Sequence, residues 1–416
     1  MRELFSSEFF AGNRQNLRRL FTGTAPIVIT GNGLLQRGAD ATYPFAQDAN
    51  FWYLSGIEEP DAVLVMDKDK EYLIVPSRNA SRQAFDGKVD AAYMRSRSGI
   101  SMFVDEEEGK RLLAARLKRA KHVATLAPAP AYVETMGFYA NPARARLLDM
   151  LHELNPRLQQ LDLSQHLRRQ RMVKQPVELG AIQAAIDITA ETLKEVTKPA
   201  KLRTYAYEYE IEADITRGFR SRGAAEHAFE PIVASGRRAC TLHNVANNGQ
   251  LAADELVVLD VGAEVEHYAA DITRTVALGG KPTKRQRNMY DTVLEVQEYA
   301  KSLLQPGVVI RDYEAKVEQF MGEKLRTLGL IKSIDQDSVR RFYPHATSHF
   351  MGLNVHDTGD YSQPLQPGMV LTVEPGIYVA DEAIGVRIED DVLITDTGIA
   401  VLTAGLPRAL DGRHAE

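Results

Sequence analysis

Two aspartates, Asp260 and Asp271, stand within sequence that otherwise reads as buried β-strand. The apolar run of residues 257–261 predicts one strand, and apolar alternation over residues 268–277 predicts a second strand that returns along the first. With the turn centred directly after Val265, the two strands form a hairpin in which the two aspartates face each other. The fold of this chain must therefore stabilise two opposed carboxylates in a core hairpin.

Opposed carboxylates on an antiparallel pair are roughly 5 Å apart and repel each other, so this hairpin requires a compensating group. A proton shared between the two acids is one possibility, and a solvated, exposed face of the sheet is another. A divalent cation would satisfy both sets of oxygens at once. The hairpin alone leaves these three possibilities open.

A later pair of predicted strands repeats the pattern. Glu374 ends an apolar strand at residues 369–373, and Glu389 lies inside another at residues 384–394. Arg387 is two residues before Glu389 and therefore on the same strand face, where its guanidinium can pair with a carboxylate. One such acid is commonly a strand-edge residue, but four acids in two hairpins indicate a common site.

Each hairpin follows a pair of predicted helices, which indicates an internal repeat with the two hairpins side by side. The helices are predicted at residues 177–196, 205–221, 284–304 and 312–328. The preceding sequence alternates between helical and strand patterns, and a chain of 416 residues is expected to form two domains. We predict an α+β protein with a smaller α/β domain at residues 1–172 and the repeat-containing domain at residues 173–416.

Three of the ten histidines, His345, His349 and His356, lie in one short polar segment that is predicted to be a loop or a short strand. A single histidine is more often structural than a ligand, but three beside buried acids reverse that preference. His243 lies in another predicted loop. Taken alone it is more often a structural or surface residue, although its loop can reach the same cleft.

These candidates combine four carboxylates with imidazole and no thiolate. Hard oxygen donors with one or two nitrogens suit Mn²⁺, Co²⁺, Fe²⁺ or Zn²⁺, and they do not suit a structural zinc knot. Two ions roughly 3.5–4 Å apart and bridged by carboxylates would use all four acids, and a water between them loses its proton near neutral pH. The pattern therefore favours hydrolysis.

The composition argues against several other functions. A net charge of −6 makes nucleic acid or an anionic membrane an improbable main partner, and no apolar run is long enough to predict a membrane span. The basic cluster that includes Arg171 and Lys174 reads as a solvated helix face or linker. Cys240 is the only cysteine, which fits a reducing compartment, and the first residues lack a signal-peptide pattern, so we expect a cytoplasmic protein.

The motifs resemble those of aminopeptidase P, the Xaa-Pro aminopeptidase family of metallopeptidases with the pita-bread fold. The matching segments are YPFAQDANFWYLSGIEEPDAVLV at 43–65, LDVGAEVEHYAADITRT at 259–275, HATSHFMGLNVHD at 345–357, LTVEPGIY at 371–378 and VRIEDDVLIT at 386–395. The resemblance implies a pita-bread catalytic domain preceded by the N-terminal domain of that family. Methionine aminopeptidases share the metal site but usually lack the N-terminal module.

Carried over by position, the resemblance implies that two divalent ions share five ligands. These ligands are Asp260, Asp271, His349, Glu374 and Glu389. Asp271 and Glu389 are the implied bridging pair, and Glu374 is also the implied acid/base. We expect Mn²⁺, with Co²⁺, Zn²⁺ or Fe²⁺ as alternatives.

The resemblance also assigns roles around the metal ligands. His356 and His243 are expected to line the cleft and hold the scissile carbonyl and the developing oxyanion, with His345 on the far side of the substrate. Tyr378 and Arg387 are expected to hold metal-bound carboxylates in place. The chain departs from the usual family pattern, without loss of a ligand, at Ala46, Arg238, Ala346 and Asn354.

We therefore expect a metal-dependent exopeptidase that removes the N-terminal residue from peptides with proline at the second position, through attack by a hydroxide bridging two metals. Prolidase, which cleaves Xaa-Pro dipeptides with the same ligands, is the nearest alternative. A non-catalytic pita-bread binding module or a metal-free creatinase-type hydrolase is expected to have lost several ligands. We expect no nucleic-acid or membrane partner, and a homodimer or homotetramer.

Overall fold

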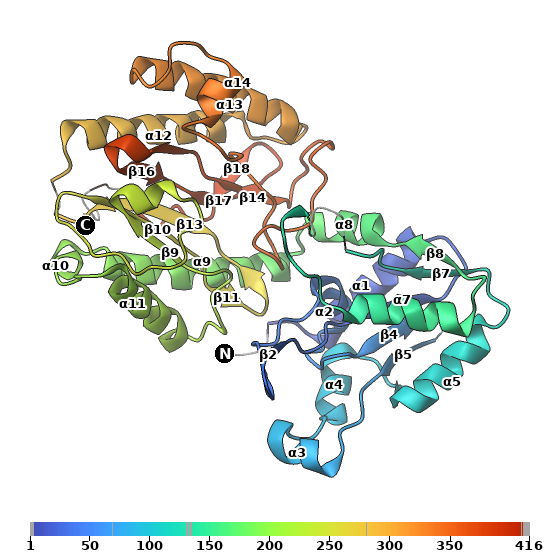
Figure 1. Cartoon of the computed structure of the whole chain (residues 1–416). Helices are drawn as coiled ribbons and strands as arrows, with labels where there is room; N and C mark the ends of the chain where they lie inside the picture. The colour runs from blue at the N-terminus through green and yellow to red at the C-terminus, as the bar shows by residue number, and fades with distance from the viewer. Residues whose placement is uncertain are drawn as a thin grey trace. The chain divides into compact units, whose positions relative to one another are not determined.

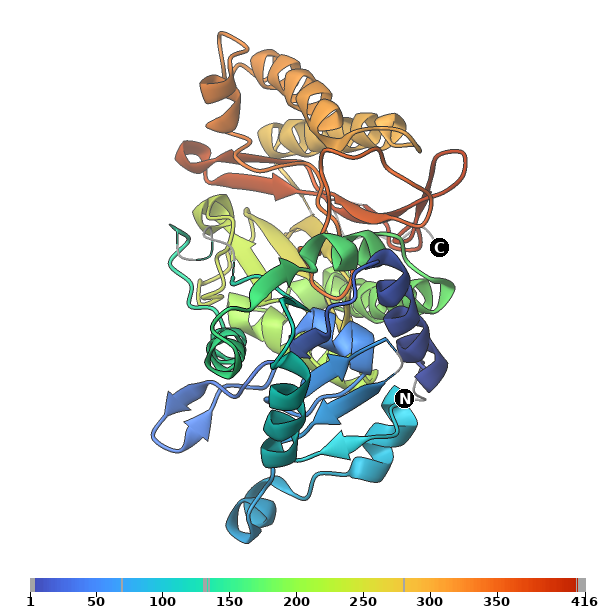
Figure 2. The same ribbon diagram turned by 90° about the vertical axis from the view of Figure 1, so that its right-hand side faces the viewer.

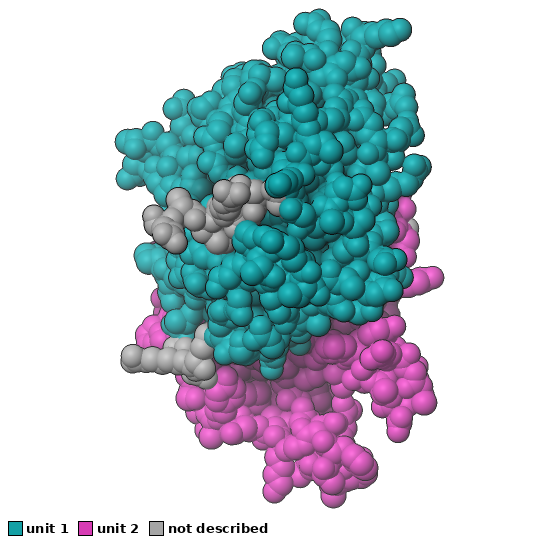
Figure 3. Space-filling model, turned by 90° about the vertical axis from the view of Figure 1, so that its left-hand side faces the viewer, with its two compact units in different colours: residues 1–4, 171–416 teal, residues 5–170 magenta. Residues whose placement is uncertain are grey.

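The structure is a computed structural model that describes residues 4–408 and 410, apart from residues 69, 130–132, 134 and 280. The chain divides into two compact units, residues 5–170 and residues 171–416 together with residues 1–4 (Figure 3). These compact units are defined by contacts and not by independent folding. The predicted domain boundary between residues 172 and 173 therefore stays a prediction. Among the described helices, none combines the length and the apolar character needed to cross a membrane.

The unit of residues 5–170 is an α/β structure built on one mixed sheet. Its elements are α1 (Ser7–Leu20), β1 (Ile27–Thr30), β2 (Gln36–Gly38), β3 (Ala41–Thr42), α2 (Ala49–Ser55), β4 (Val63–Met66), β5 (Glu71–Ile74), α3 (Ala80–Asp86), α4 (Ala91–Ser98), β6 (Phe103–Val104), α5 (Glu106–Leu117), β7 (His122–Thr125), α7 (Ala143–Leu154) and β8 (Gln159–Asp162). The six-stranded sheet has the order β6-β5-β4-β1-β7-β8. Helices α5 and α7 bury Leu113 and Leu147 against Val28 and Val123 of the sheet, which gives this unit its own core.

The other unit begins within α8 and contains two sets of helices and strands. Its elements are α8 (Ser164–Met172), α9 (Pro176–Val196), α10 (Pro199–Leu202), α11 (Glu208–Ser221), β9 (Ile232–Ser235), β10 (Leu256–Val261), β11 (Glu264–Val265), β12 (Tyr268–Ala269), β13 (Ile272–Ala277), α12 (Lys284–Leu303), α13 (Ile310–Thr327), α14 (Gln336–Arg340), β14 (Val370–Val373), β15 (Gly376–Val379), β16 (Ile384–Arg387), β17 (Asp390–Ile394) and β18 (Ile399–Val401). The predicted helices and the first strand of each pair agree with this order to within a few residues.

The two halves of this unit lie side by side, each with helices covering its strands (Figures 1 and 2). In the first half α9 and α11 lie against β9 and the β11–β12 hairpin, whereas in the second half α12 lies against β14, β15 and β16. The halves join along β13, where the Thr275 hydroxyl donates to the Arg387 carbonyl at 2.8 Å and the Glu389 N–H donates to the Thr273 carbonyl at 3.1 Å. The predicted α+β architecture with an internal repeat is confirmed.

The register of the first hairpin differs from the prediction. Asp260 lies opposite Thr273, not opposite Asp271. The turn consists of Glu266 and His267, whose φ angles of 48° and 67° are those that a two-residue type I′ turn requires. It is centred one residue later than predicted, which shifts the pairing by two residues. An even shift leaves every side chain on its original face, so the two aspartates are diagonal neighbours on one face.

The second hairpin is also more complex than the predicted pair of strands. The predicted strand at residues 384–394 is divided, because β16 pairs with β15 whereas β17 pairs with β14. Glu389 lies at this division, directly before β17. A change of pairing partner at this point frees the backbone of Glu389 to donate to the neighbouring half.

The expectation that Arg171 and Lys174 are solvated is wrong. Their relative exposures are 2% and 6%, and both pair with the buried carboxylate of Asp357. The Lys174 ammonium lies 3.0 Å from Asp357 and also donates to the Arg171 carbonyl at 2.6 Å. These cations anchor the segment that follows His356 to the start of the unit.

Candidate metal centre

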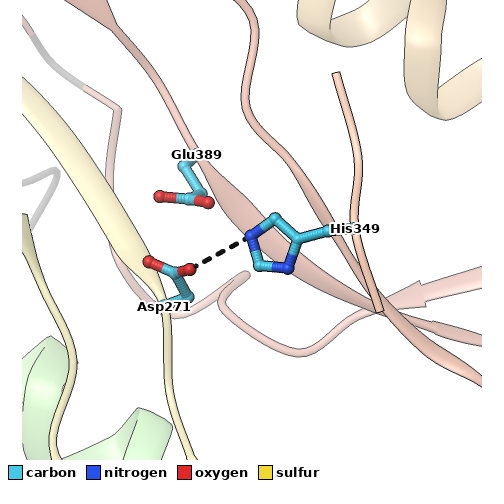
Figure 4. Close-up of side chains that lie close together, drawn as sticks. All are labelled: Asp271, His349 and Glu389. Atoms are coloured by element: carbon cyan, nitrogen blue, oxygen red, sulfur yellow. Dashed lines mark ion pairs between the residues drawn. The ribbon is translucent and has the colours of Figure 1, made fainter. Parts of the chain in front are cut away.

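Three of the predicted ligands form a compact cluster. Asp271, His349 and Glu389 each offer one ligand atom, and these atoms lie within 4.8 Å of one another (Figure 4). The His349 Nε2 atom is 3.3 Å from an Asp271 carboxylate oxygen. Asp271 directly precedes β13, Glu389 lies between β16 and β17, and His349 comes from the segment before β14, so both halves contribute.

Glu374, which follows β14, completes the surroundings of the same imidazole. One of its oxygens is 3.4 Å from His349 Nε2, and the other is 3.6 Å from His345 Nδ1. Asp260, on β10, accepts from the Arg387 guanidinium at 2.5 Å through Oδ2. Its other oxygen, Oδ1, is buried without a hydrogen-bond partner in the part of the chain that the structure describes. A buried, unpaired carboxylate oxygen is suited to a cation.

The acids of this cluster disfavour one another's charged forms. Burial raises the pKa of Asp271 well above its ordinary value, and the charges of Asp260 and Asp391 raise it further. Burial and the charge of Asp271 do the same to Glu389, and burial and the charge of Glu389 do so to Glu374. Such a cluster is stabilised by protons or by cations, and hard oxygen donors with one imidazole fit a divalent metal.

The imidazole of His349 is suited to metal ligation. Burial, and secondarily the charge of His356, lower the pKa of His349 to about 3, so the ring is neutral at physiological pH. Its Nδ1 atom lies 3.1 Å from the Phe350 carbonyl oxygen, which can only accept. Nδ1 therefore carries the proton, and Nε2 presents its lone pair to the acids.

Arg387 is the cation that contacts the acid cluster. In addition to Asp260, it donates through Nη1 to the Tyr378 hydroxyl at 2.8 Å and through Nε to the Thr273 hydroxyl at 3.2 Å. The Tyr378 hydroxyl lies 2.8 Å from His345 Nε2. Tyr378 thus contacts Arg387 rather than a carboxylate. A chain of hydrogen bonds runs from Asp260 through Arg387 and Tyr378 to His345.

The other two predicted cleft histidines lie on the solvent side of the cluster. The ring of His356 meets that of His349 edge to face, with 4.3 Å between ring centroids. His243 and His356 are both exposed. Burial lowers the pKa of His356, and the charge of His243 lowers it further; for His345 burial comes first, then the charge of Arg387, and His243 contributes less. All ten predicted site residues are therefore brought to one region; their individual roles stay predictions.

Sequence reasoning missed three residues that support the cluster. Thr273 donates its hydroxyl to Glu389 at 2.7 Å, and the Asp391 carboxylate accepts from the Asp271 N–H at 3.2 Å. Glu314, on α13, accepts two backbone N–H groups beside His349. The acidic run at residues 389–391 was a readable signal for Asp391, but a single glutamate on an amphipathic helix gave none for Glu314.

Comparisons with known proteins agree with this geometry. Residues 180–396 match the model of metallopeptidase family M24, and residues 10–124 match that of the aminopeptidase P N-terminal domain. The Xaa-Pro aminopeptidase of Escherichia coli is 33% identical over 432 residues, which cover 98% of this chain and 96% of that protein. The chain belongs to the aminopeptidase P group of metallopeptidase family M24.

Other members of the aminopeptidase P group match over similar lengths. Xaa-Pro aminopeptidase 3 of Homo sapiens is 32% identical over 415 residues, covering 92% of this chain and 79% of that protein. The structure of Escherichia coli aminopeptidase P with the inhibitor Pro-Leu has a TM-score of 0.85 at 32% identity, covering 98% of this chain and 97% of that one. A zinc-substituted form of that enzyme in complex with product has a TM-score of 0.86. The predicted family and the metallopeptidase class are confirmed.

Proposed function

We propose that this chain is a metal-dependent exopeptidase that removes the N-terminal residue from peptides whose second residue is proline. The observation that carries the proposal is the buried cluster of acids around the neutral His349, within the aminopeptidase P fold. The inhibitor Pro-Leu in the Escherichia coli structure begins with proline, as does the peptide that remains after such a cleavage. The substrate class follows from this likeness.

Two divalent ions held by five ligands are part of the proposal. The residues that would hold them are Asp260, Asp271, His349, Glu374 and Glu389, of which Asp271 and Glu389 would serve both ions. When bound, divalent ions polarise a peptide carbonyl and lower the pKa of water toward neutrality. We propose Mn²⁺ as the resident ion, while Co²⁺, Zn²⁺ and Fe²⁺ suit the same donors.

The side chains around the cluster supply the proton transfers and the orientation of substrate. Glu374 takes the proton of the attacking water and delivers it to the proline nitrogen, which needs a proton to leave. His345, held by Tyr378, limits the position of Glu374 on one side. His356 and His243, on the solvent side, hold the scissile carbonyl and stabilise its developing negative charge.

The cleavage of an Xaa-Pro bond requires a site that does not depend on an N–H at the second residue. The proline nitrogen has no hydrogen and its ring fixes φ, so a cleft that reads extended backbone N–H groups fails there. A cleft that reads the free α-amino group and the proline ring can succeed. The free α-amino group would bind a metal ion or an acidic side chain near it.

The decisive experiment is an assay of chelated protein on an Xaa-Pro-Xaa tripeptide and on an Xaa-Pro dipeptide, after separate addition of Mn²⁺, Co²⁺ and Zn²⁺. We expect metal-dependent release of the first amino acid from the tripeptide, with a higher kcat/KM than for the dipeptide. Preference for the dipeptide would identify a prolidase. Fewer than one bound ion per chain, with no release of amino acid, would instead support a non-catalytic binding module.

The role of His356 can be separated from metal binding. We expect His356→Ala to retain its metal ions while kcat falls about 100-fold, within the range for removal of a group that stabilises developing charge. Metal content measured by atomic emission, together with kcat, tests this. Loss of metal in the variant, or unchanged turnover, would contradict the assignment.

The compartment and the assembly are also proposed. We propose a reducing, cytoplasmic setting on the basis of the single cysteine, Cys240. Burial raises the pKa of its thiol, which makes the thiol less reactive. We propose a homodimer or homotetramer on the basis of the family resemblance. Light scattering at several protein concentrations tests the assembly.

A further inference from the structure

Glu314 accepts two consecutive backbone N–H groups from the segment that carries His345 and His349. Its Oε2 atom accepts from Thr347 N and its Oε1 atom from Ser348 N, both at 2.9 Å. Thr347 and Ser348 are buried and lie outside any helix or strand, so no neighbouring strand pairs with these N–H groups. The carboxylate of Glu314 thus satisfies two donors that would otherwise be costly to bury.

The opposite side of this segment is held by β14 and the residue that follows it. The Thr347 carbonyl accepts from the Glu374 N–H at 2.8 Å, and the His349 carbonyl accepts from the Thr372 N–H at 3.0 Å. The segment is therefore fixed between α13 on one side and β14 with Glu374, the residue that follows it, on the other. Loss of the Glu314 bonds would leave the backbone of residues 347–349 hydrogen-bonded on the β14 side only.

Two hydroxyl contacts, one from α13 and one from Tyr343 after α14, also hold this segment. The Tyr313 hydroxyl, one residue before Glu314, lies 3.0 Å from the Ser348 hydroxyl. The Tyr343 hydroxyl lies 2.5 Å from that of Thr347. These contacts are between neutral groups, whereas a carboxylate that accepts two N–H groups forms stronger, charge-assisted bonds. Glu314 is thus the principal anchor on this side.

We infer that Glu314 is a positioning residue of the metal centre, which aims the His349 imidazole at Asp271 and Glu374 by fixing the backbone of residues 347 and 348. The inference rests on the ligand role proposed for His349. The His349 Nε2 atom is already 3.3 Å and 3.4 Å from oxygens of those two acids. A small rotation of the backbone before His349 would change both distances, and outer partners of this kind commonly control metal affinity.

The variant Glu314→Gln tests the inference with the least change in shape. The amide oxygen of glutamine can accept a hydrogen bond from one of the two N–H groups. Its NH₂ group then faces the other N–H, and two donors cannot form a hydrogen bond. We expect the dissociation constant for Mn²⁺ to rise about 10- to 100-fold. It is measured by competition with a chromophoric chelator on protein shown to be folded by circular dichroism. In the Co²⁺-loaded variant we expect altered visible absorption bands, since these report the geometry of the ligands.

Glu318→Gln is the matched control. Glu318 lies one turn further along α13, pairs with Arg340 at 3.3 Å, and shares with Glu314 the lining of a cavity of about 170 Å³. This substitution should leave Mn²⁺ affinity and the Co²⁺ spectrum unchanged within about twofold. Equal weakening by both variants, or unchanged affinity in Glu314→Gln, would overturn the inference.

A second variant covers the case in which Glu314→Gln fails to fold. In Glu314→Ala the neighbouring cavity can admit water to the exposed N–H groups, so the fold has an alternative source of acceptors. Metal affinity should still fall, because mobile water does not fix the segment; wild-type affinity would overturn the inference. Failure of the wild-type protein itself to bind metal would refute the proposed function, which distinguishes the two.

Discussion

Glu389 and Asp390 are consecutive in the chain and equally buried, at 1% and 2% relative exposure, yet their surroundings are opposite in charge. Glu389 faces the acids of the metal centre, and the charges there add to burial in raising its pKa. Asp390 faces Arg274 at 2.8 Å and Lys301 at 3.4 Å. Burial alone would raise the pKa of Asp390, but Arg274 and Lys301, with a hydrogen bond from Thr403 and the charge of Arg408, outweigh burial and the pKa is lowered.

The difference between these neighbours teaches that burial does not by itself mark a functional acid. Asp390, like Asp357 with Arg171 and Lys174, receives its countercharge from the chain. The candidate metal centre has four acids. Among the described residues, the guanidinium of Arg387 is the one that contacts them. The acids around Glu389 thus have fewer positive charges beside them than Asp390 has. This deficit identifies the position at which an external cation would bind.

The largest expected effect is that of Glu389→Gln. Loss of a ligand should exceed the 10- to 100-fold cost of losing an outer partner, so we expect kcat/KM to fall by at least about 10³-fold. The metal-free variant should be about 1 kcal/mol more stable than metal-free wild type near pH 7.5, because a carboxyl whose pKa is raised on folding destabilises the folded state at neutral pH and glutamine does not. Urea denaturation in chelator and a tripeptide assay test both. If the metal-free variant were less stable than metal-free wild type, the contrast drawn between Glu389 and Asp390 would be wrong.

Asp390→Asn should act in the opposite direction. It leaves Arg274 and Lys301 buried without their countercharge, and we expect a loss of about 3 kcal/mol of stability with or without metal. Because the folded-state pKa of Asp390 is lowered, its stabilising contribution is present at neutral pH and is lost as the pH falls through that value. Urea denaturation at pH 7 tests the prediction; an unchanged midpoint would contradict it.

Metal binding should release protons from carboxyl groups rather than from histidines. The raised pKa values of Asp271, Glu374 and Glu389 mean that the metal-free cluster retains protons that a cation must displace. His345 and His349, with pKa values of about 4 and about 3, are already neutral at pH 7. Affinity should therefore rise with pH, about tenfold per unit for each proton released.

Calorimetry of Mn²⁺ binding at pH 7 in buffers of different ionisation enthalpy measures this release. We expect about one proton or more per chain. A value of zero would mean that the acids are already ionised in the metal-free protein. That result would contradict the electrostatic difference between the surroundings of Glu389 and those of Asp390.

The smallest expected effect is that of Arg408→Ala. The Arg408 Nε atom is 3.9 Å from Asp390, and its side chain is 30% exposed. Such a pair, partly screened by water, contributes less than about 1 kcal/mol. Arg408 also donates to Gln297 at 2.8 Å and pairs with Glu298. A larger loss in urea denaturation that is absent from the Asp390→Asn background would show that the countercharge of Asp390 extends to the surface.

Much of the architecture could be predicted because the signals are local. Acids inside apolar strands, helices with apolar periodicity, and a cluster of histidines are all visible in short windows. The family motifs supplied the ligand set, and the structure brings its members together. The register of the first hairpin was wrong because its turn uses Glu266 and His267 in a left-handed conformation that favours glycine or asparagine.

What could not be predicted depends on partners far away in sequence. Arg171 reads as a surface cation until Asp357, 186 residues later, is placed beside it. Glu314 is one acid among several on an amphipathic helix, and its role depends on backbone N–H groups more than 30 residues away. A short stretch of sequence shows the periodicity from which helices and strands are inferred. It contains no information on partners that lie far away in the chain.

The contact between Thr273 and Glu389 spans 116 residues, and that between Asp260 and Arg387 spans 127. During synthesis the first hairpin therefore leaves the ribosome on the order of 10 s before the second, at typical elongation rates. In that interval Asp260 and Asp271 have neither their guanidinium nor their partner glutamates. A metal ion that needs ligands from both hairpins can therefore be held only after residue 389 has been made.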